Sequence, residues 1–210
     1  MQRVMISRRF LLAGFAGLAS TPARAQQMDI TRATAFVDRA GQDLVNAIND
    51  PRLNQTQRRD RVASILRNAI DIEGTGRFIL GRYVRQASPA ELQDYQKLFD
   101  EIIIRNLSAR FGEYRGVKFS LGRSQQRTEE DALVSTLVER PNSPAFTLDW
   151  RVAEINGQPK VVDVIAEGTS LRLTTRSEYA AVIQRNSGRV ASLLEAMRGQ
   201  IAQLAAREGG

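Results

Sequence analysis

The stretch FTLDWRVAEINGQPKVVDVIA, residues 146–166, sets the architecture of the chain. Its first half alternates large apolar residues with polar ones, which is the period of a half-buried strand. The apolar positions are Phe146, Leu148, Trp150 and Val152. Asn156-Gly157 is the strongest two-residue signal for a β-hairpin, and residues 161–166 form the returning strand. We therefore predict an antiparallel hairpin over residues 146–166.

Helices are predicted on both sides of this hairpin. Apolar residues recur at three- and four-residue steps in residues 36–48, 62–70 and 179–204, which is the period of an amphipathic helix. The segment SPAE at 88–91 is typical of a helix start, with serine as the N-cap and proline at the first helical position. The glycines of EGTGR at 73–77 predict a break between two helices, because a phosphate-binding loop would need a preceding strand and further glycines.

The order of the elements predicts the fold class. Residues 117–121 alternate as a strand does, and residues 132–139 are apolar on both faces. Together with the hairpin they make an antiparallel meander of about four strands between two helical regions, which is an α+β arrangement. No repeat, low-complexity tract or linker interrupts residues 26–210, so we predict a single domain there.

The first 25 residues have the pattern of a secretory leader. They hold four arginines and no acid, an uncharged apolar run at 10–19, and the small-x-small sequence ARA at 23–25. The run is too short to span a bilayer as a helix, and the whole pattern predicts cleavage after Ala25. SRRFL at 7–11 also resembles a twin-arginine export signal. The less favoured alternative is a buried first helix of the mature domain. We expect an exported protein, periplasmic if its source is a bacterium.

Cleavage would remove most of the net charge. The full chain has 30 Lys and Arg against 23 Asp and Glu, a net charge of +7, and removing the four leader arginines leaves 26 against 23, or +3. The remaining arginines are interleaved with acids, and the thirteen aromatic residues (eight Phe, four Tyr, one Trp) form no cluster of the kind that single-strand binders use. We therefore predict no nucleic-acid partner.

The composition excludes several kinds of reactive site. The chain has no His and no Cys, which excludes a Ser-His triad, a thiolate nucleophile, a disulfide and a His- or Cys-ligated metal. The acidic run at 129–131 lacks the alternating spacing of a calcium loop and is predicted to be a solvated turn. Asp149 and Asp163 alternate with buried strand positions, so we expect both to face solvent and not to act in acid/base catalysis. We predict no catalytic residue, metal or cofactor.

Three stretches resemble the MlaC family of periplasmic phospholipid carriers. Residues 78–99, with FILGRY and ASPAE followed by a Tyr and a Phe, follow the family pattern LGxYxxxATPxQxxxYxxxF. Residues 163–171, DVIAEGTSL, match its Asp-x-x-x-Glu-Gly-x-Ser, with Thr169 where Val is usual. Residues 176–188, which begin RSEY and end Ser-Gly, resemble the segment before the terminal helix of the family. The likeness runs from about residue 35 to residue 204, in the expected order.

The resemblance implies a fold and a function. The family fold is a twisted antiparallel sheet packed by N- and C-terminal helices around an apolar pocket, which holds the tails of a phospholipid. Such carriers shuttle lipid through the periplasm between an outer-membrane lipoprotein–porin complex and an inner-membrane ABC transporter with a membrane-anchored substrate-binding ring, and so maintain outer-membrane lipid asymmetry. One alternative is a carrier of the same fold for another lipid such as a hopanoid. Another is a small-molecule enzyme on a similar α+β cone, which is disfavoured because the inward strand positions named above offer no polar group.

The candidate site residues follow from the apolar pattern and from the resemblance. Periodicity alone cannot distinguish a lipid cavity from a plain core. The candidate lipid-binding residues are Phe78, Leu80, Tyr83, Phe99, Ile103, Leu107, Phe111, Leu148, Trp150, Val152, Val164 and Leu171. The family-motif residues Asp163, Glu167, Gly168 and Ser170 are assigned a structural role. Gly168 is predicted to adopt a positive φ and Ser170 to cap a helix; the alternative is that these residues shape the mouth of the pocket. By charge complementarity, headgroup contact is expected from Arg82, Arg85, Arg172 or Arg176.

Overall fold

The sheet is antiparallel and its strands are neighbours in chain order. The computed structural model describes residues 28–112 and 116–208, so the predicted leader lies outside the described residues. The strands are β1 (Lys118–Gln126), β2 (Asp131–Arg140), β3 (Ser143–Ile155), β4 (Gln158–Ala166) and the two-residue β5 (Thr169–Ser170), in the order β1-β2-β3-β4-β5. The predicted α+β fold is confirmed, and the short β5 is added to the four strands expected.

The β3–β4 hairpin forms where the sequence predicts it. Asn156 has φ 51° and Gly157 has φ 78°, and positive φ at both central residues is what a type I′ hairpin turn requires. In the resulting register Trp150 lies between Val134 of β2 and Val164 of β4. The alternating apolar residues of β3 therefore share one face of the sheet with those of its neighbours.

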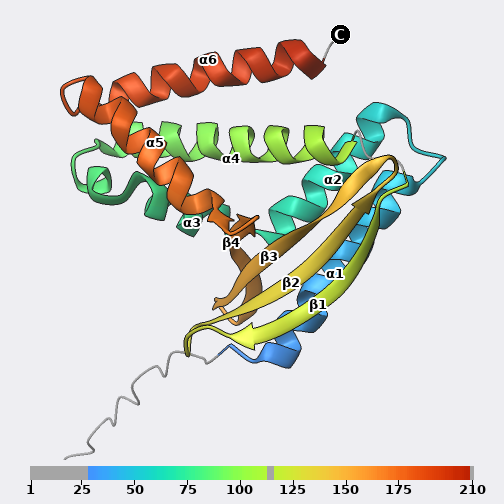
Figure 1. Ribbon diagram of the computed structural model, residues 1–210. Helices are drawn as coiled ribbons and strands as arrows, with labels where there is room; N and C mark the ends of the chain where they lie inside the picture. The colour runs from blue at the N-terminus through green and yellow to red at the C-terminus, as the bar shows by residue number, and fades with distance from the viewer. Residues whose placement is uncertain (1–27, 113–115, 209–210) are drawn as a thin grey trace, which may run out of the picture.

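Helices cover that face and gather at one side of the sheet (Figure 1). The helices are α1 (Ile30–Asn49), α2 (Gln55–Ala69), α3 (Ile72–Leu80), the 3-10 helix η1 (Gly81–Arg85), α4 (Pro89–Gly112), α5 (Leu171–Arg185) and α6 (Val190–Glu208). Helix α1 runs along the sheet, whereas α4, α5 and α6 lie together. The predicted start of α4 is confirmed: Glu91 N donates to Ser88 Oγ at 3.2 Å, and Ser88 N donates to the Glu91 carboxylate at 2.8 Å, which is a capping box.

The predicted break at residues 73–77 is wrong, because α3 runs through both glycines. Asp71 is the N-cap and accepts a hydrogen bond from Gly74 N at 3.0 Å. Gly76 is buried, and a Cβ there would lie 2.9 Å from the Phe99 ring of α4. The second glycine therefore allows close packing of two helices, and the chain breaks earlier, at the junction of α2 and α3.

The apolar core has three parts that together link helices to sheet. One lies among α3, α4, α5 and α6, one joins α1 and α2 to α4 and the inner face of the sheet, and one lies between the start of α1 and strands β2 and β3. Among the helices of the described residues, none has both the length and the apolar character needed to cross a bilayer. The space between the helices and the sheet is where two cavities lie.

Candidate functional site

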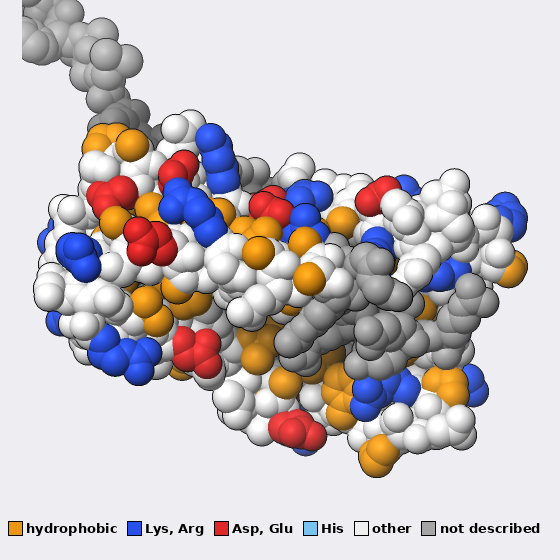
Figure 2. Space-filling view, turned by 90° about the horizontal axis from the view of Figure 1, so that it is seen from above, with side chains coloured by type: hydrophobic (Ala, Val, Ile, Leu, Met, Phe, Trp, Pro, Cys, Tyr) orange, Lys and Arg blue, Asp and Glu red, His pale blue; other side chains and the backbone are white. Residues whose placement is uncertain are grey.

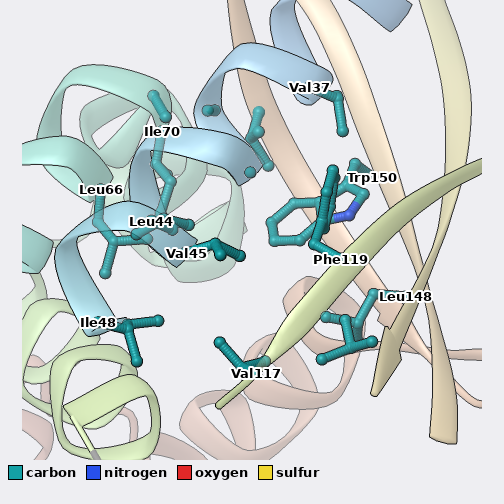
Figure 3. Close-up of a pocket in the computed structure, with 15 residues that line it drawn as sticks. Val37, Leu44, Val45, Ile48, Leu66, Ile70, Val117, Phe119, Leu148 and Trp150 are labelled. Atoms are coloured by element: carbon teal, nitrogen blue, oxygen red, sulfur yellow. The ribbon is translucent and has the colours of Figure 1, made fainter. Parts of the chain in front are cut away.

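The first cavity, the α1 seam, lies between α1, α2 and the inner face of the sheet (Figure 3). Its wall is almost entirely hydrocarbon, and the rings of Phe119 and Trp150 lie between α1 and the strands. The cavity volume is about 40 Å³, which is room for only a few water molecules. The labelled lining residues are Val37, Leu44, Val45, Ile48, Leu66, Ile70, Val117, Phe119, Leu148 and Trp150.

The polar atoms beside the seam are already paired with one another. Trp150 Nε1 donates to Thr136 Oγ1 at 2.8 Å, and Thr136 Oγ1 donates to the Leu148 carbonyl at 3.1 Å. At the opposite wall, a Cβ on Gly41 would lie 2.4 Å from the Phe119 ring, so the glycine lets that ring approach α1. The seam therefore offers apolar contact without an unpaired indole N–H.

Polar contacts fasten α1 to the sheet at both ends of the seam. At its start, Thr34 Oγ1 lies 2.7 Å from Ser124 Oγ of β1, and Arg32 donates to Glu154 and to the Gly157 carbonyl. At its end, the Asn49 amide donates to the Val117 carbonyl at 3.2 Å. A neutral hydrogen bond contributes about 0.5–1.5 kcal/mol and one between charged groups about 1.5–3 kcal/mol, so the Arg32–Glu154 pair holds the start of α1 more strongly than the hydroxyl and amide contacts hold the rest of the helix.

The second cavity, the α4–α5 groove, is larger and has a polar rim. Its volume is about 360 Å³, and α3, α4, β4, α5 and α6 all contribute to its wall. The apolar lining includes Phe99, Ile103, Leu107, Val164 and Leu171, and the polar lining includes Asn106, Arg172, Thr175, Glu178 and Gln200. Burial raises the pKa of Tyr179, another lining residue, to about 12. Its phenol is therefore neutral at ordinary pH.

The two cavities meet at Ile70 and Val161, which line both of them. These two residues form an isolated parallel bridge, and Asp71 N donates to the Val161 carbonyl at 2.9 Å. This bridge, between the end of α2 and β4, is therefore part of the wall that the two cavities share. The α1 seam and the α4–α5 groove thus adjoin each other at these two apolar side chains.

The structure distributes the predicted lipid-binding residues over several places. Five line the α4–α5 groove: Phe99, Ile103, Leu107, Val164 and Leu171. Leu148 and Trp150 line the α1 seam. Leu80 and Tyr83 are buried in the helical core, Phe78 packs against that core, and Val152 is buried under the start of α1. The side chain of Phe111 lies outside the described residues.

Sequence reasoning missed the contribution of α1 and α2 to the cavities. Val37, Leu44, Val45 and Ile48 supply one wall of the seam, and Ile70 stands at the boundary. Their three- and four-residue spacing was the available signal, but it predicts only a buried helix face. Nothing in the local sequence distinguishes a face that lines a cavity from one that fills a core.

The expectation that Asp163 faces solvent is wrong. It is 7% exposed, and its carboxylate accepts hydrogen bonds from Ser170 Oγ at 2.6 Å and from Arg172 N at 3.1 Å. Ser170 caps α5 by accepting from Leu173 N at 3.1 Å. Glu167 and Gly168 have φ 49° and 81° and turn the chain from β4 into β5. The Asp-x-x-x-Glu-Gly-x-Ser motif thus builds the start of α5.

The prediction of a solvated turn at residues 129–131 is wrong for Asp131, whose carboxylate is buried. Glu129 and Glu130 are exposed, but Asp131 belongs to β2 and is 1% exposed. Arg151 Nε donates to its carboxylate at 2.6 Å, and Arg127 lies 3.6 Å from the same oxygen.

Asp149, the other strand carboxylate expected to face solvent, is half-buried and has one carboxylate oxygen without a hydrogen bond. Within residues 28–112 and 116–208, no three acidic side chains come together as a metal site requires.

The four arginines expected near a headgroup lie in different settings. Arg82 and Arg85 are exposed on η1. Arg176 donates to the Phe78 carbonyl at 2.8 Å, and Arg172 lines the α4–α5 groove. On the face drawn in Figure 2, basic and acidic side chains are interspersed, with apolar side chains visible between them. Of the four arginines, Arg172 is therefore the one positioned at the groove.

Comparison with known proteins identifies relatives of the chain. The model of the family described as MlaC protein matches residues 38–199. The toluene tolerance protein ttg2D of Pseudomonas putida is 23% identical over 145 residues, which are 69% of this chain and 67% of that protein. A phospholipid-binding protein from Ralstonia solanacearum, solved in complex with a phospholipid, is similar in structure with a TM-score of 0.73. That match has 27% sequence identity and covers 82% of this chain and 98% of the other.

Proposed function

Because the chain belongs to the MlaC family, whose members carry phospholipid and are not enzymes, we propose that it encloses the acyl chains of a phospholipid in the α1 seam and the α4–α5 groove. The observation that carries this proposal is the meeting of two apolar cavities at Ile70 and Val161. The groove, at about 360 Å³, is much larger than the seam and would receive a chain first. The seam, at about 40 Å³, would have to widen by movement of α1 away from the sheet.

The energetics of carriage require no catalytic group. Burying a methylene is worth about 0.8 kcal/mol, so two long acyl chains represent roughly 20 kcal/mol or more relative to water. A bilayer offers the chains nearly the same stabilisation. The carrier therefore needs an apolar, shape-tolerant cavity that stabilises the acyl chains about as well as a membrane does. Its partners can then set the direction of transfer through small differences in their affinity for the lipid.

The cellular location and the partners of the carrier are inferred from the leader pattern and from the family. We infer export to the periplasm, with exchange of lipid at an outer-membrane lipoprotein–porin complex and at an inner-membrane ABC transporter with a membrane-anchored substrate-binding ring. The basic and apolar leader pattern at residues 1–25 supports export. Lipid asymmetry of the outer membrane would then depend on this chain as the soluble link between two membrane complexes.

Trp150 offers a direct test of chain placement, because it is the only tryptophan of the protein and lines the α1 seam. Phosphatidylglycerol vesicles with brominated acyl chains are mixed with the protein, and the vesicles are then removed by centrifugation. We expect lipid to remain with the protein and Trp150 fluorescence to fall by roughly half or more, because bromine quenches only at close contact and buried side chains are tightly packed around a ligand.

The matched control moves the reporter to the surface. In Trp150→Phe/Leu173→Trp the tryptophan occupies a position that is 54% exposed in the present structure, and its fluorescence should change little with the same bound lipid. Lipid bound without quenching of Trp150 would contradict the placement of chains in the seam. Absence of bound lipid would contradict the carrier function itself.

A further inference from the structure

Resting on the proposed function, we propose that Arg172 binds the phosphate group of the carried lipid at the rim of the α4–α5 groove and thereby selects phospholipids over uncharged lipids with the same chains. Arg172 is the second residue of α5 and lines the groove. Only 13% of its side chain is exposed. A guanidinium remains protonated in proteins, so the groove has a largely buried positive charge at its rim.

The hydrogen-bonding capacity of this guanidinium is unused within the described residues. Its Nε is buried and has no hydrogen-bond partner. The closest carboxylate oxygen, Asp163 Oδ2, is 3.9 Å from that nitrogen and already accepts the Ser170 hydroxyl, while Asp163 Oδ1 accepts the backbone N–H of Arg172. The side chain is held instead by the Phe78 ring, whose centroid is 4.0 Å from the Arg172 guanidinium carbon.

Arg172 belongs to a group of five charged side chains whose net charge is +1. The groups that act on it are Arg127, Arg151, Asp131 and Asp163. Asp163 forms a long ion pair with Arg172, 3.9 Å from Oδ2 to Nε, and Asp131 is shared by Arg151 and Arg127. With Arg172 itself the five groups make three cations and two anions, so the excess positive charge belongs to the group as a whole. Burial lowers the pKa of Arg172, and repulsion by Arg151 lowers it further. An incoming anion would relieve both effects.

The groove supplies the rest of a phospholipid site. Its floor of Ile103, Leu107 and Val164 suits acyl chains, and Thr175 lies one helical turn from Arg172 on the same rim. Glu178 also lines the groove but is exposed, so water and salt screen its charge. Hydrogen bonds from a guanidinium to phosphate are among the strong ones. A phosphate at Arg172 would therefore fix the headgroup at the mouth and direct the chains inward.

The test is a competition between phosphatidylglycerol and diacylglycerol with identical acyl chains, because only the first has a phosphate. Both lipids are offered in mixed vesicles, and the protein-bound lipids are quantified by mass spectrometry. Arg172→Gln should lower the bound ratio of phosphatidylglycerol to diacylglycerol about tenfold, as expected for loss of a charged hydrogen bond. Arg172→Lys, which keeps the charge, should retain part of the preference.

The control is Arg198→Gln, because Arg198 pairs with the exposed Asp94 and does not line the groove; it should leave the ratio unchanged. An unchanged ratio in Arg172→Gln, with both lipids still bound, overturns the inference and leaves the carrier function intact. Failure of the unmodified protein to bind either lipid overturns the carrier function instead. If inorganic phosphate at the same concentration displaces phosphatidylglycerol, the site binds free phosphate and the inference also fails.

Discussion

A disulfide between positions 34 and 124 is expected to block lipid uptake. In the double variant Thr34→Cys/Ser124→Cys the new thiols replace hydroxyl oxygens that lie 2.7 Å apart, one on α1 and one on β1, and a disulfide joins two sulfurs at about 2.05 Å. The chain has no other cysteine, so this bond has no competitor. If the α1 seam widens to hold a chain, as proposed above, the oxidised variant should take up phosphatidylglycerol at least about tenfold more slowly, as for a closed lid.

Reduction supplies the internal control for this variant. Dithiothreitol should restore uptake to the level of the unmodified protein, because the reduced side chains no longer hold α1 against β1. Each single variant, Thr34→Cys or Ser124→Cys, should respond to neither oxidant nor reductant. Rapid uptake by the fully oxidised double variant would show that α1 stays on the sheet during lipid entry and would remove the seam from the account.

The largest loss of stability is expected from Phe99→Ala. Phe99 is 1% exposed, and its ring stacks on Tyr95 with centroids 5.8 Å apart. Truncating a buried phenylalanine to alanine costs about 3–5 kcal/mol, against total stabilities of about 5–15 kcal/mol for whole domains. Urea unfolding followed by circular dichroism measures the free energy of unfolding of both proteins.

Leu171→Ala is the matched control for that measurement. Leu171 lines the same groove but is 45% exposed, and substitution of an exposed residue usually changes stability by less than about 0.5 kcal/mol. A loss below about 1 kcal/mol for Phe99→Ala would mean that the ring belongs to a deformable cavity wall and not to the packed core of α3, α4 and α6. The comparison therefore separates the two roles that the sequence could not separate.

The parts of the fold that were predicted are those fixed by neighbours in the chain. Asn156-Gly157 makes a hairpin turn by itself, and Ser88 with Glu91 makes a capping box within one helical turn. The buried states of Asp131 and Asp163 could not be predicted in this way. Asp131 is buried by arginines that include Arg151 of another strand, and Asp163 by the start of α5.

The candidate site also has parts that the local sequence predicts and parts that depend on residues distant in the chain. Residues such as Ile103 and Leu107 could be recognised as large and apolar on one helix face, and the structure has them at the α4–α5 groove; their contact with lipid stays a prediction. The α1 seam depends on how closely α1 approaches the sheet, which is set by pairs such as Gly41 and Phe119 that are distant in sequence. Such a pair has no local signal, and so the seam could be found only in the folded structure.

Native mass spectrometry of the purified protein, expressed from its full sequence, tests the central claim most directly. If the chain is a phospholipid carrier, the spectrum contains the polypeptide with a bound phospholipid, and collisional activation releases that lipid and leaves the bare chain. A spectrum of the bare polypeptide alone, both as purified and after incubation with phosphatidylglycerol vesicles, would contradict the account.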